Sequence, residues 1–274
     1  MLDAVLLFRE ALYGTLVIAL ACSVLGVYVV LRRIVFVGAA LAELSSAGIA
    51  LALWLEGQSV ALGLSTHPIA LALLFTIAGV LFFGSSSGRG RVPPDATIGV
   101  TYAVAAAVGI LLISKAAHGE VHDIFLQGNI LGITRTDTWV LLAVGIPVLM
   151  AHGAFYKEFL FVSFDRETAR TLGFNVGFWN LFLYFTLGLV IAFAMQFAGV
   201  LLVFNFLVLP AVTGLLISRS MGGTFAWSIG SALLAAVVGF SVSVPFDLPS
   251  GPAIIAVSGV LGLIAFGIRL TQRR

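Results

Sequence analysis

Apolar runs of about twenty residues follow one another along almost the whole chain. A run of that length is what a helix needs to cross the hydrocarbon core of a bilayer. Hydrophobic residues make up 61% of the 274 residues and charged residues only 9%, whereas a typical soluble domain carries about 25% charged residues. The sequence therefore predicts an all-α, polytopic membrane protein, formed by one transmembrane domain over residues 1–274.

Nine runs are long enough to be spanning helices, within an expected total of about eight to ten. Only Gln196 and Phe197 separate the sixth and seventh runs, so this pair is expected to be a tight hairpin or a broken helix. Pro210 is expected to kink the seventh run, because proline removes one backbone hydrogen bond. The runs lie near residues 11–31, 34–55, 67–84, 96–114, 138–156, 178–195, 198–217, 224–244 and 253–268.

The basic residues predict the orientation of these helices. Loops on the cytosolic side of a membrane protein carry an excess of lysine and arginine. With nine spans, eleven of the 14 basic residues fall on one side and three on the other. Merging the sixth and seventh runs would break this alternation, so we treat them as two spans. We expect the N-terminus outside and the C-terminus in the cytoplasm, with only Arg9, Lys115 and Arg135 on the outer side.

The densest charge cluster of the chain lies between the fifth and sixth runs, at residues 164–174. It is predicted to be a short cytosolic helix that Asp165 caps and Gly173 ends, with Arg170 placed favourably for the helix dipole. Such a segment is either a plain connecting loop or a docking element that another protein binds. The chain has no nucleotide-binding loop, so energy from ATP would have to come from a partner. The residues of interest are Phe164, Asp165, Arg166, Glu167, Arg170 and Gly173.

Glu43 is the one ionisable residue well inside a predicted span. A charge at the bilayer centre costs about 2.5–3.5 kcal/mol on insertion scales, so it should face the protein interior, a water path or a partner. Glycine, alanine and serine surround it, and such small residues allow close packing or line a passage. Two interpretations remain open, a residue of a translocation path or a protonated carboxyl bonded to a neighbouring helix.

Two further groups of residues lie on the predicted outer side. His118, Glu120, His122 and Asp123 combine imidazole and carboxylate groups, a combination that suits zinc or manganese, although exposed loops often hold a histidine or two. Asp247 lies in the proline-rich turn before the last run. It either caps that helix, belongs to a simple turn, or lies at a mouth as a candidate residue of the translocation path or of a metal site. His67 and His152 are expected at helix ends. The single cysteine, Cys22, excludes an internal disulfide.

Four segments, in this order, resemble the permease subunits of the zinc, manganese and iron family of ABC importers. They are RRIVFVGAALAELSSAGIALAL, TIGVTYAVAAAVGILLIS, FDRETARTLGFNVGFWN, and the C-terminal pair GVLLVFNFLVLPAVTGLLIS and FDLPSGPAIIAVSGVLGL. The resemblance covers most of the chain from about residue 31.

The resemblance implies a homodimeric permease in the inner membrane of a prokaryote. Two cytosolic ATPase subunits would hold the ATP, and residues 164–174 would be the coupling helix that docks into them. An external binding protein would deliver a divalent metal ion as the substrate, and this chain would bind no cofactor of its own and no nucleic acid. The ion would pass between two copies of Glu43 related by the twofold axis.

The chain departs from the family pattern at the positions thought to touch the ion. Family members typically read G-D-A-L-S-H-A where this chain has Gly38 to Leu44, so Ala39 replaces the aspartate and Glu43 the histidine. One carboxylate without imidazole favours a harder ion or a weaker, transient site. The chain could therefore also be an ABC permease for a non-metal substrate. A membrane scaffold and an intramembrane enzyme are further alternatives, although no HExxH motif or pair of facing aspartates is present.

Overall fold

The computed structural model describes residues 8–57, 67–86, 93–115 and 130–272. Over these ranges the chain is helical and contains no strand, which confirms the predicted fold class. Seven of the described helices are long and apolar enough to cross a membrane, and Pro68–Gly84 is a shorter apolar helix. The groups at His118, Glu120, His122 and Asp123 lie outside the described residues.

The long helices begin and end within a few residues of the predicted apolar runs. Two short helices, α8 and α9, and one 3-10 turn, η2, lie between them. The elements are α2 (Arg9–Leu31), α3 (Val35–Gly57), α4 (Pro68–Ser86), α5 (Pro94–Lys115), η2 (Ile130–Gly132), α7 (Arg135–Ala154), α8 (Tyr156–Phe164), α9 (Arg166–Thr171), α10 (Val176–Ile217), α11 (Met221–Ser243) and α12 (Ser250–Gln272).

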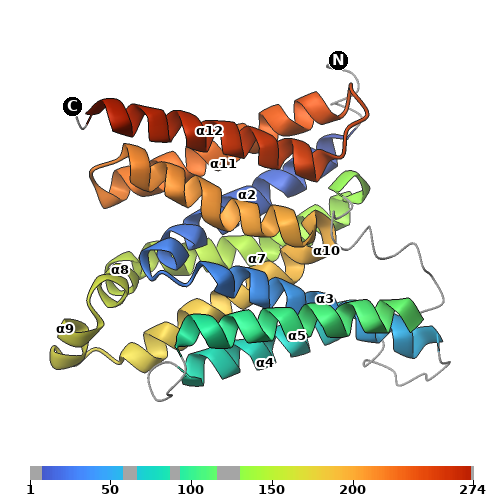
Figure 1. The fold of residues 1–274 in the computed structure, drawn as a ribbon, viewed down its shortest axis with the longest axis horizontal. Coiled ribbons are helices and arrows are strands. Elements are labelled where there is room, and N and C mark those ends of the chain that lie inside the picture. Colours follow the sequence, from blue (N-terminus) through green and yellow to red (C-terminus); the bar gives the residue numbers. More distant parts are fainter. Residues whose placement is uncertain (1–7, 58–66, 87–92, 116–129, 273–274) are drawn as a thin grey trace.

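The 42 residues of α10 form two arms that fold back on each other. The backbone leaves helical geometry at Gly199 (φ 71°, ψ 168°), a conformation that favours glycine. The first arm, residues 176–198, begins beside α9, and the second, residues 200–217, returns towards the same end of the bundle (Figure 1). Contacts with α2 agree, because Asn180 meets the end of α2 at Arg32 and Leu207 approaches Gly26. The break thus lies at Gly199, three residues after Gln196, and Pro210 lies inside the second arm, where the backbone keeps helical φ and ψ.

One end of the bundle collects α8, α9, the turn between α2 and α3, the connection between α10 and α11, and the end of α12 (Figure 1). Of the ten lysine and arginine residues in the described ranges, seven belong to segments at this end. The other three, Arg9, Lys115 and Arg135, belong to the opposite ends of α2, α5 and α7. The structure thus separates the basic residues in the way that the sequence predicts.

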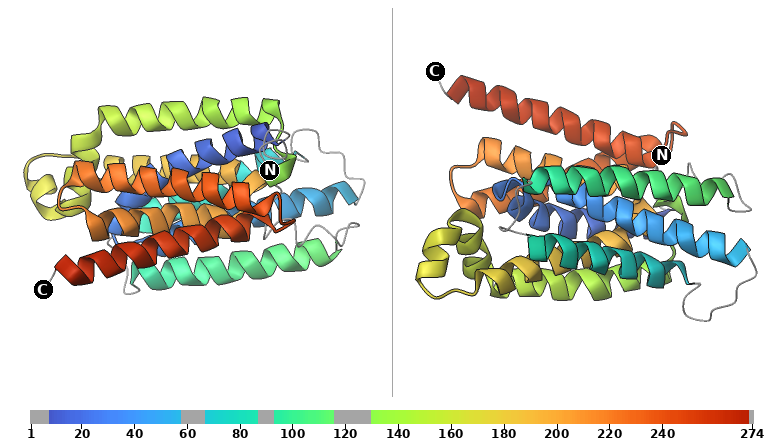
Figure 2. Two further views of the ribbon diagram at one scale, coloured as in Figure 1. Left: turned by 90° about the horizontal axis from the view of Figure 1, so that it is seen from above. Right: turned by 60° about the horizontal axis from the view of Figure 1, so that its bottom comes forward.

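Helices α2, α3 and α10 form the interior of the bundle, and α5 and α7 lie on opposite flanks (Figure 2). Small residues let the interior helices approach closely. A Cβ atom at Gly26 of α2 would overlap the carbonyl oxygen of Leu207, and one at Gly48 of α3 would overlap that of Leu71 in α4. The outer helices α5 and α12 expose large apolar side chains such as Leu111 and Leu263, as expected for helices that face lipid or a partner.

Candidate functional site

The charged segment between α7 and α10 folds as the sequence predicts. The Asp165 carboxylate accepts a hydrogen bond from the backbone N–H of Thr168 (3.0 Å) and so caps α9. The hydrogen bonds from Thr168 lower the pKa of Asp165. At the other end Gly173 has a φ of 85°, and the N–H groups of Gly173 and Phe174 bond back to Arg170 and Ala169. This is a Schellman motif, which satisfies the last carbonyl groups of the helix.

Helices α8 and α9 form an elbow with a small apolar core of its own. Ala169, Val162 and Val176 are buried in it, and the rings of Phe161 and Phe174 pack edge to face over 5.4 Å. This core holds α9 in a fixed position relative to α8 and to the start of α10, so the segment has a defined shape before any partner binds.

Two large apolar side chains stand out on the exposed face of this elbow. Phe164 is 58% exposed and Leu172 is 65% exposed, although both flank a helix of charged residues. Arg166, Glu167 and Arg170 are exposed beside them. A surface that combines exposed apolar anchors with charged groups has the composition of a protein interface.

The elbow is tied to the spanning helices by a partly buried guanidinium group. Arg32, at the end of α2, donates from Nε to the Ser163 hydroxyl in α8 (2.8 Å) and from Nη1 to Asn180 Oδ1 in α10 (2.8 Å). Arg166 of α9 donates to the same Asn180 oxygen at 3.4 Å. Burial, and next the charge of Arg166, lower the pKa of Arg32 to about 10, so its guanidinium remains charged at neutral pH. These bonds join α2, α8, α9 and α10 at one point.

Aromatic side chains pack directly behind this junction. His152, near the end of α7, stacks on Phe159 of α8 with ring centroids 4.1 Å apart, and its Nε2 lies 2.9 Å from the Thr186 hydroxyl in α10. Tyr28 of α2 packs against both rings. His152 therefore lies near a helix end, as predicted, but it is buried and holds α7, α8 and α10 together.

The sequence alone does not reveal the roles of Arg32, Ser163 and Asn180. Two adjacent arginines at the end of an apolar run look like basic residues of a cytosolic loop. Arg32, however, is part of the interior. One residue in the sequence does point to this junction. Asn180 is a polar residue just inside an apolar run, and a polar residue at such a position needs a hydrogen-bonding partner.

Glu43 lies near the middle of α3, on a face that is buried in the bundle. It is only 7% exposed, and Ala39, one turn earlier on the same face, is equally buried. Glu43 makes no hydrogen bond from its side chain within the described residues. Among those residues no three histidine, cysteine or carboxylate side chains gather in a way that would hold a metal ion. Within one copy of the chain, the described ranges thus offer a single carboxylate at this depth and no complete metal centre.

Asp247 lies at the opposite end of the bundle from α9. It is exposed and has a positive φ of 51°, inside a turn closed by a hydrogen bond from the Leu248 N–H to the Ser243 carbonyl. Helix α12 begins only at Ser250, whose hydroxyl pairs with that of Ser243. Asp247 therefore belongs to the turn. His67 is exposed directly before α4, and its carbonyl accepts two of the first N–H groups of that helix, as expected for a helix end.

The sequence and the fold both match known proteins. Residues 5–269 match the model of the ABC 3 transport family. The chain belongs to the ABC 3 transport family. It is 31% identical to the manganese transport system membrane protein MntC of Listeria monocytogenes, over 94% of this chain and 89% of that protein. It is 30% identical to the manganese import system permease protein ScaB of Streptococcus gordonii, over 97% and 92% of the two chains.

Solved structures of similar proteins share the arrangement of helices. PsaBC from Streptococcus pneumoniae, solved in complex with a Fab, superposes with a TM-score of 0.81 at 27% identity, over 94% of this chain and 90% of that chain. A putative metal-chelate type ABC transporter in an inward-facing conformation has the same fold, with a TM-score of 0.72 at 15% identity, over 96% and 85% of the two chains. The resemblance to ABC importer permeases is confirmed, and the chain is a multi-span membrane permease.

Proposed function

We propose that the chain is the membrane-spanning subunit of an ATP-driven importer for a divalent metal ion, with manganese as the first candidate. The observation that carries this proposal is the preformed elbow of α8 and α9, with Phe164 and Leu172 exposed at the basic end of the bundle. The names of the relatives MntC and ScaB support manganese as the ion.

The elbow is the site where a separate cytosolic ATPase subunit docks. Leu172 and Phe164 enter an apolar groove of that partner, while Arg166, Glu167 and Arg170 set the orientation through paired charges. The ATPase holds and hydrolyses ATP, and this chain carries no catalytic residue. When the two ATPases close, α9 moves, and Arg32 and Asn180 transmit the movement to α2 and α10.

The chain crosses the membrane nine times within its described residues, because the two arms of α10 and the shorter helix α4 each count as one crossing. The N-terminus lies outside and the C-terminus in the cytoplasm. The separation of basic residues, seven at the α9 end against three at the other, supports this orientation.

Two copies of the chain form a homodimer, and an external binding protein delivers the ion to it. The ion passes between the two copies of Glu43, whose charges it balances during passage. The lack of a complete metal centre within the described residues of one copy supports a transient site shared between two copies.

ATP-driven uptake of manganese into vesicles tests the proposal. The permease is reconstituted with its ATPase and its binding protein, and accumulation of the ion is followed with ATP inside the compartment that represents the cytoplasm. Uptake that requires ATP and falls to background with Leu172→Asp supports the proposal. Ion accumulation that is equal with and without ATP would overturn it.

A further inference from the structure

A cavity of about 560 Å³ lies between α2 and α7, at the end of the bundle opposite α9. Pockets of this size hold small-molecule ligands. The cavity is lined by charged, aromatic and aliphatic side chains in successive layers, and it is separate from both the α9 elbow and Glu43.

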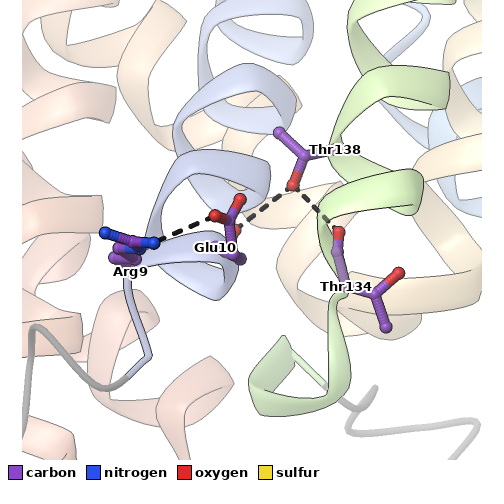
Figure 3. A network of polar contacts seen from close by, with 4 residues as sticks. All are labelled: Arg9, Glu10, Thr134 and Thr138. Carbon is purple, nitrogen blue, oxygen red and sulfur yellow. Dashed lines mark hydrogen bonds and ion pairs between the residues drawn. The ribbon is translucent and has the colours of Figure 1, made fainter.

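The cavity exists because the two helices meet beneath it and are held together at its edge. The Thr138 hydroxyl of α7 lies 3.4 Å from the Glu10 carbonyl of α2 and 3.2 Å from the Thr134 carbonyl (Figure 3). Deeper in the bundle, a Cβ atom at Gly145 of α7 would lie 3.5 Å from the side chain of Val17 in α2. The two helices are thus in contact below the cavity.

Its mouth carries two guanidinium groups and one carboxylate. Arg9 and Glu10 form a long contact, 3.7 Å between Nε and Oε1, which lies in solvent and therefore contributes little stability (Figure 3). Arg135 has no ion pair among the described residues. The neighbouring carboxylate, Asp137, is already engaged by the backbone and side chain of Thr134 in the capping box of α7. The mouth is thus able to receive an anionic group together with a cationic one.

The lower layers match the depth profile of a bilayer. Tyr13 and Trp139 line the cavity and are exposed, and Trp139 is 61% exposed. Tyrosine and tryptophan are enriched at the level of the lipid headgroups. Leu16, Val17 and Leu142 line the cavity deeper in the bundle, at the level where acyl chains lie.

We propose that this cavity binds a phospholipid of the outer leaflet whose headgroup carries both a phosphate and a primary ammonium, as in phosphatidylethanolamine. The guanidinium groups of Arg135 and Arg9 donate to the phosphate oxygens, and Glu10 accepts from the ammonium. Trp139 and Tyr13 flank the glycerol region, and the first segment of an acyl chain lies on Leu16 and Leu142. The assignment to the outer leaflet rests on the proposed orientation of the chain, whereas the cavity itself depends on the membrane fold and not on the ion that is transported.

Native mass spectrometry of the full chain, after exposure to an equimolar mixture of phosphatidylethanolamine, phosphatidylglycerol and phosphatidylcholine, tests the proposal. We expect the ethanolamine lipid to be retained about tenfold over each of the others. Phosphatidylglycerol lacks the ammonium, and the quaternary ammonium of phosphatidylcholine cannot donate a hydrogen bond to Glu10.

Variants locate the site. Glu10→Gln should abolish the preference for phosphatidylethanolamine over phosphatidylglycerol. Arg135→Gln should reduce retention of both of these lipids, whereas Arg135→Lys should retain more of them than Arg135→Gln does. Lys115→Gln removes a basic residue at the same end of the bundle but outside the cavity, and should change nothing. Equal retention of the three lipids, or an unchanged preference in both cavity variants, would overturn the proposal. Displacement of the lipid by excess inorganic phosphate alone would also overturn it, because the site would then be a simple anion site.

Discussion

Arg32 donates a hydrogen bond from Nη1 to Asn180 Oδ1 over 2.8 Å, and this bond connects the end of α2 to the start of α10. The same Asn180 oxygen accepts from Arg166 of the charged helix α9 at 3.4 Å. One side-chain amide thus receives two guanidinium groups from different segments of the chain. Because α8 is tied to the same point through Ser163, hydrogen bonds connect α8 and α9 to both interior helices.

Replacing Asn180 with alanine should weaken this junction. Asn180→Ala leaves Arg32 and Arg166 without their shared acceptor, and hydrogen bonds to charged groups contribute about 1.5–3 kcal/mol each. We expect a clear decrease in the midpoint of thermal unfolding in detergent, together with loss of ATP-driven uptake. Asn180→Asp keeps an oxygen acceptor and should retain both properties. An alanine variant that unfolds at the wild-type temperature would show that the junction does not stabilise the fold.

The cap of α9 should depend on pH. The hydrogen bonds from Thr168 lower the pKa of Asp165 in the folded chain relative to the unfolded one. The stabilising effect of the ionised cap is therefore complete above the ordinary carboxyl pKa of about 4 and is lost as the pH falls through the lower, folded value. Hydrogen exchange of the Thr168 amide checks this, since its protection should fall in that acid range. Asp165→Asn should remove the pH dependence but keep the cap, and the same acid loss in this variant would contradict the assignment.

Substitutions at two positions with positive φ should change the stability of the fold in opposite directions. Gly173 (φ 85°) ends α9 in open space, so Gly173→Ala adds only backbone strain, about 1 kcal/mol. Arg33 (φ 59°) occupies the equivalent position after α2, where the N–H groups of Arg33 and Ile34 bond back to Val30 and Val29. Arg33→Gly should therefore stabilise by up to about 1 kcal/mol. The thermal unfolding temperatures of the two variants measure both effects. Shifts of the two temperatures in the same direction would contradict the left-handed geometry at one of the two positions.

The close contact of α2 with the second arm of α10 should be intolerant of a single methyl group. Gly26→Ala places Cβ against the Leu207 carbonyl, and overpacking of this kind costs about 3 kcal/mol where backbone must move. Gly153→Ala in α7 has no neighbouring atom within 4 Å and serves as the matched control. Yield and unfolding temperature in detergent should fall for the first variant and stay unchanged for the second. Equal behaviour of the two would mean that α10 does not fold back against α2 as described.

Glu43 should be required for passage of the ion rather than for folding. We expect Glu43→Gln to lower the rate of ATP-driven manganese uptake by about tenfold, the change that corresponds to about 1.4 kcal/mol in the barrier. Ser46→Ala, at a residue of similar burial on the same helix, is the control. The unfolding temperature should be the same in all three proteins. Unchanged uptake in Glu43→Gln would remove Glu43 from the path.

The spanning helices are predictable from the sequence because each depends on a local property, a run of apolar residues of sufficient length. The boundaries of α9 are also predictable, since Asp165 and Gly173 act within one turn of their own positions. The hairpin at Gly199 is predicted only as one of two possibilities. Apolar residues continue through the turn, and only the conformational freedom of one glycine marks it.

The junction at Arg32 is not predictable in the same way. Its partners Ser163 and Asn180 lie 131 and 148 residues away in sequence, and an arginine next to a second arginine at a helix end looks like a cytosolic charge. The burial of His152 is hidden for a similar reason, because Thr186 and Phe159 lie on other helices. Side chains that join distant helices leave little local pattern in the sequence.

Capture of the cytosolic ATPase by the purified permease tests the proposed docking site most directly. The elbow of α8 and α9 is proposed to be that site, so Leu172→Asp should abolish co-purification of the ATPase while the permease keeps its wild-type unfolding temperature. Leu270→Asp, which changes an exposed leucine at the same end of the bundle on α12, should leave co-purification intact. Full retention of the ATPase by a stably folded Leu172→Asp permease would contradict the central claim.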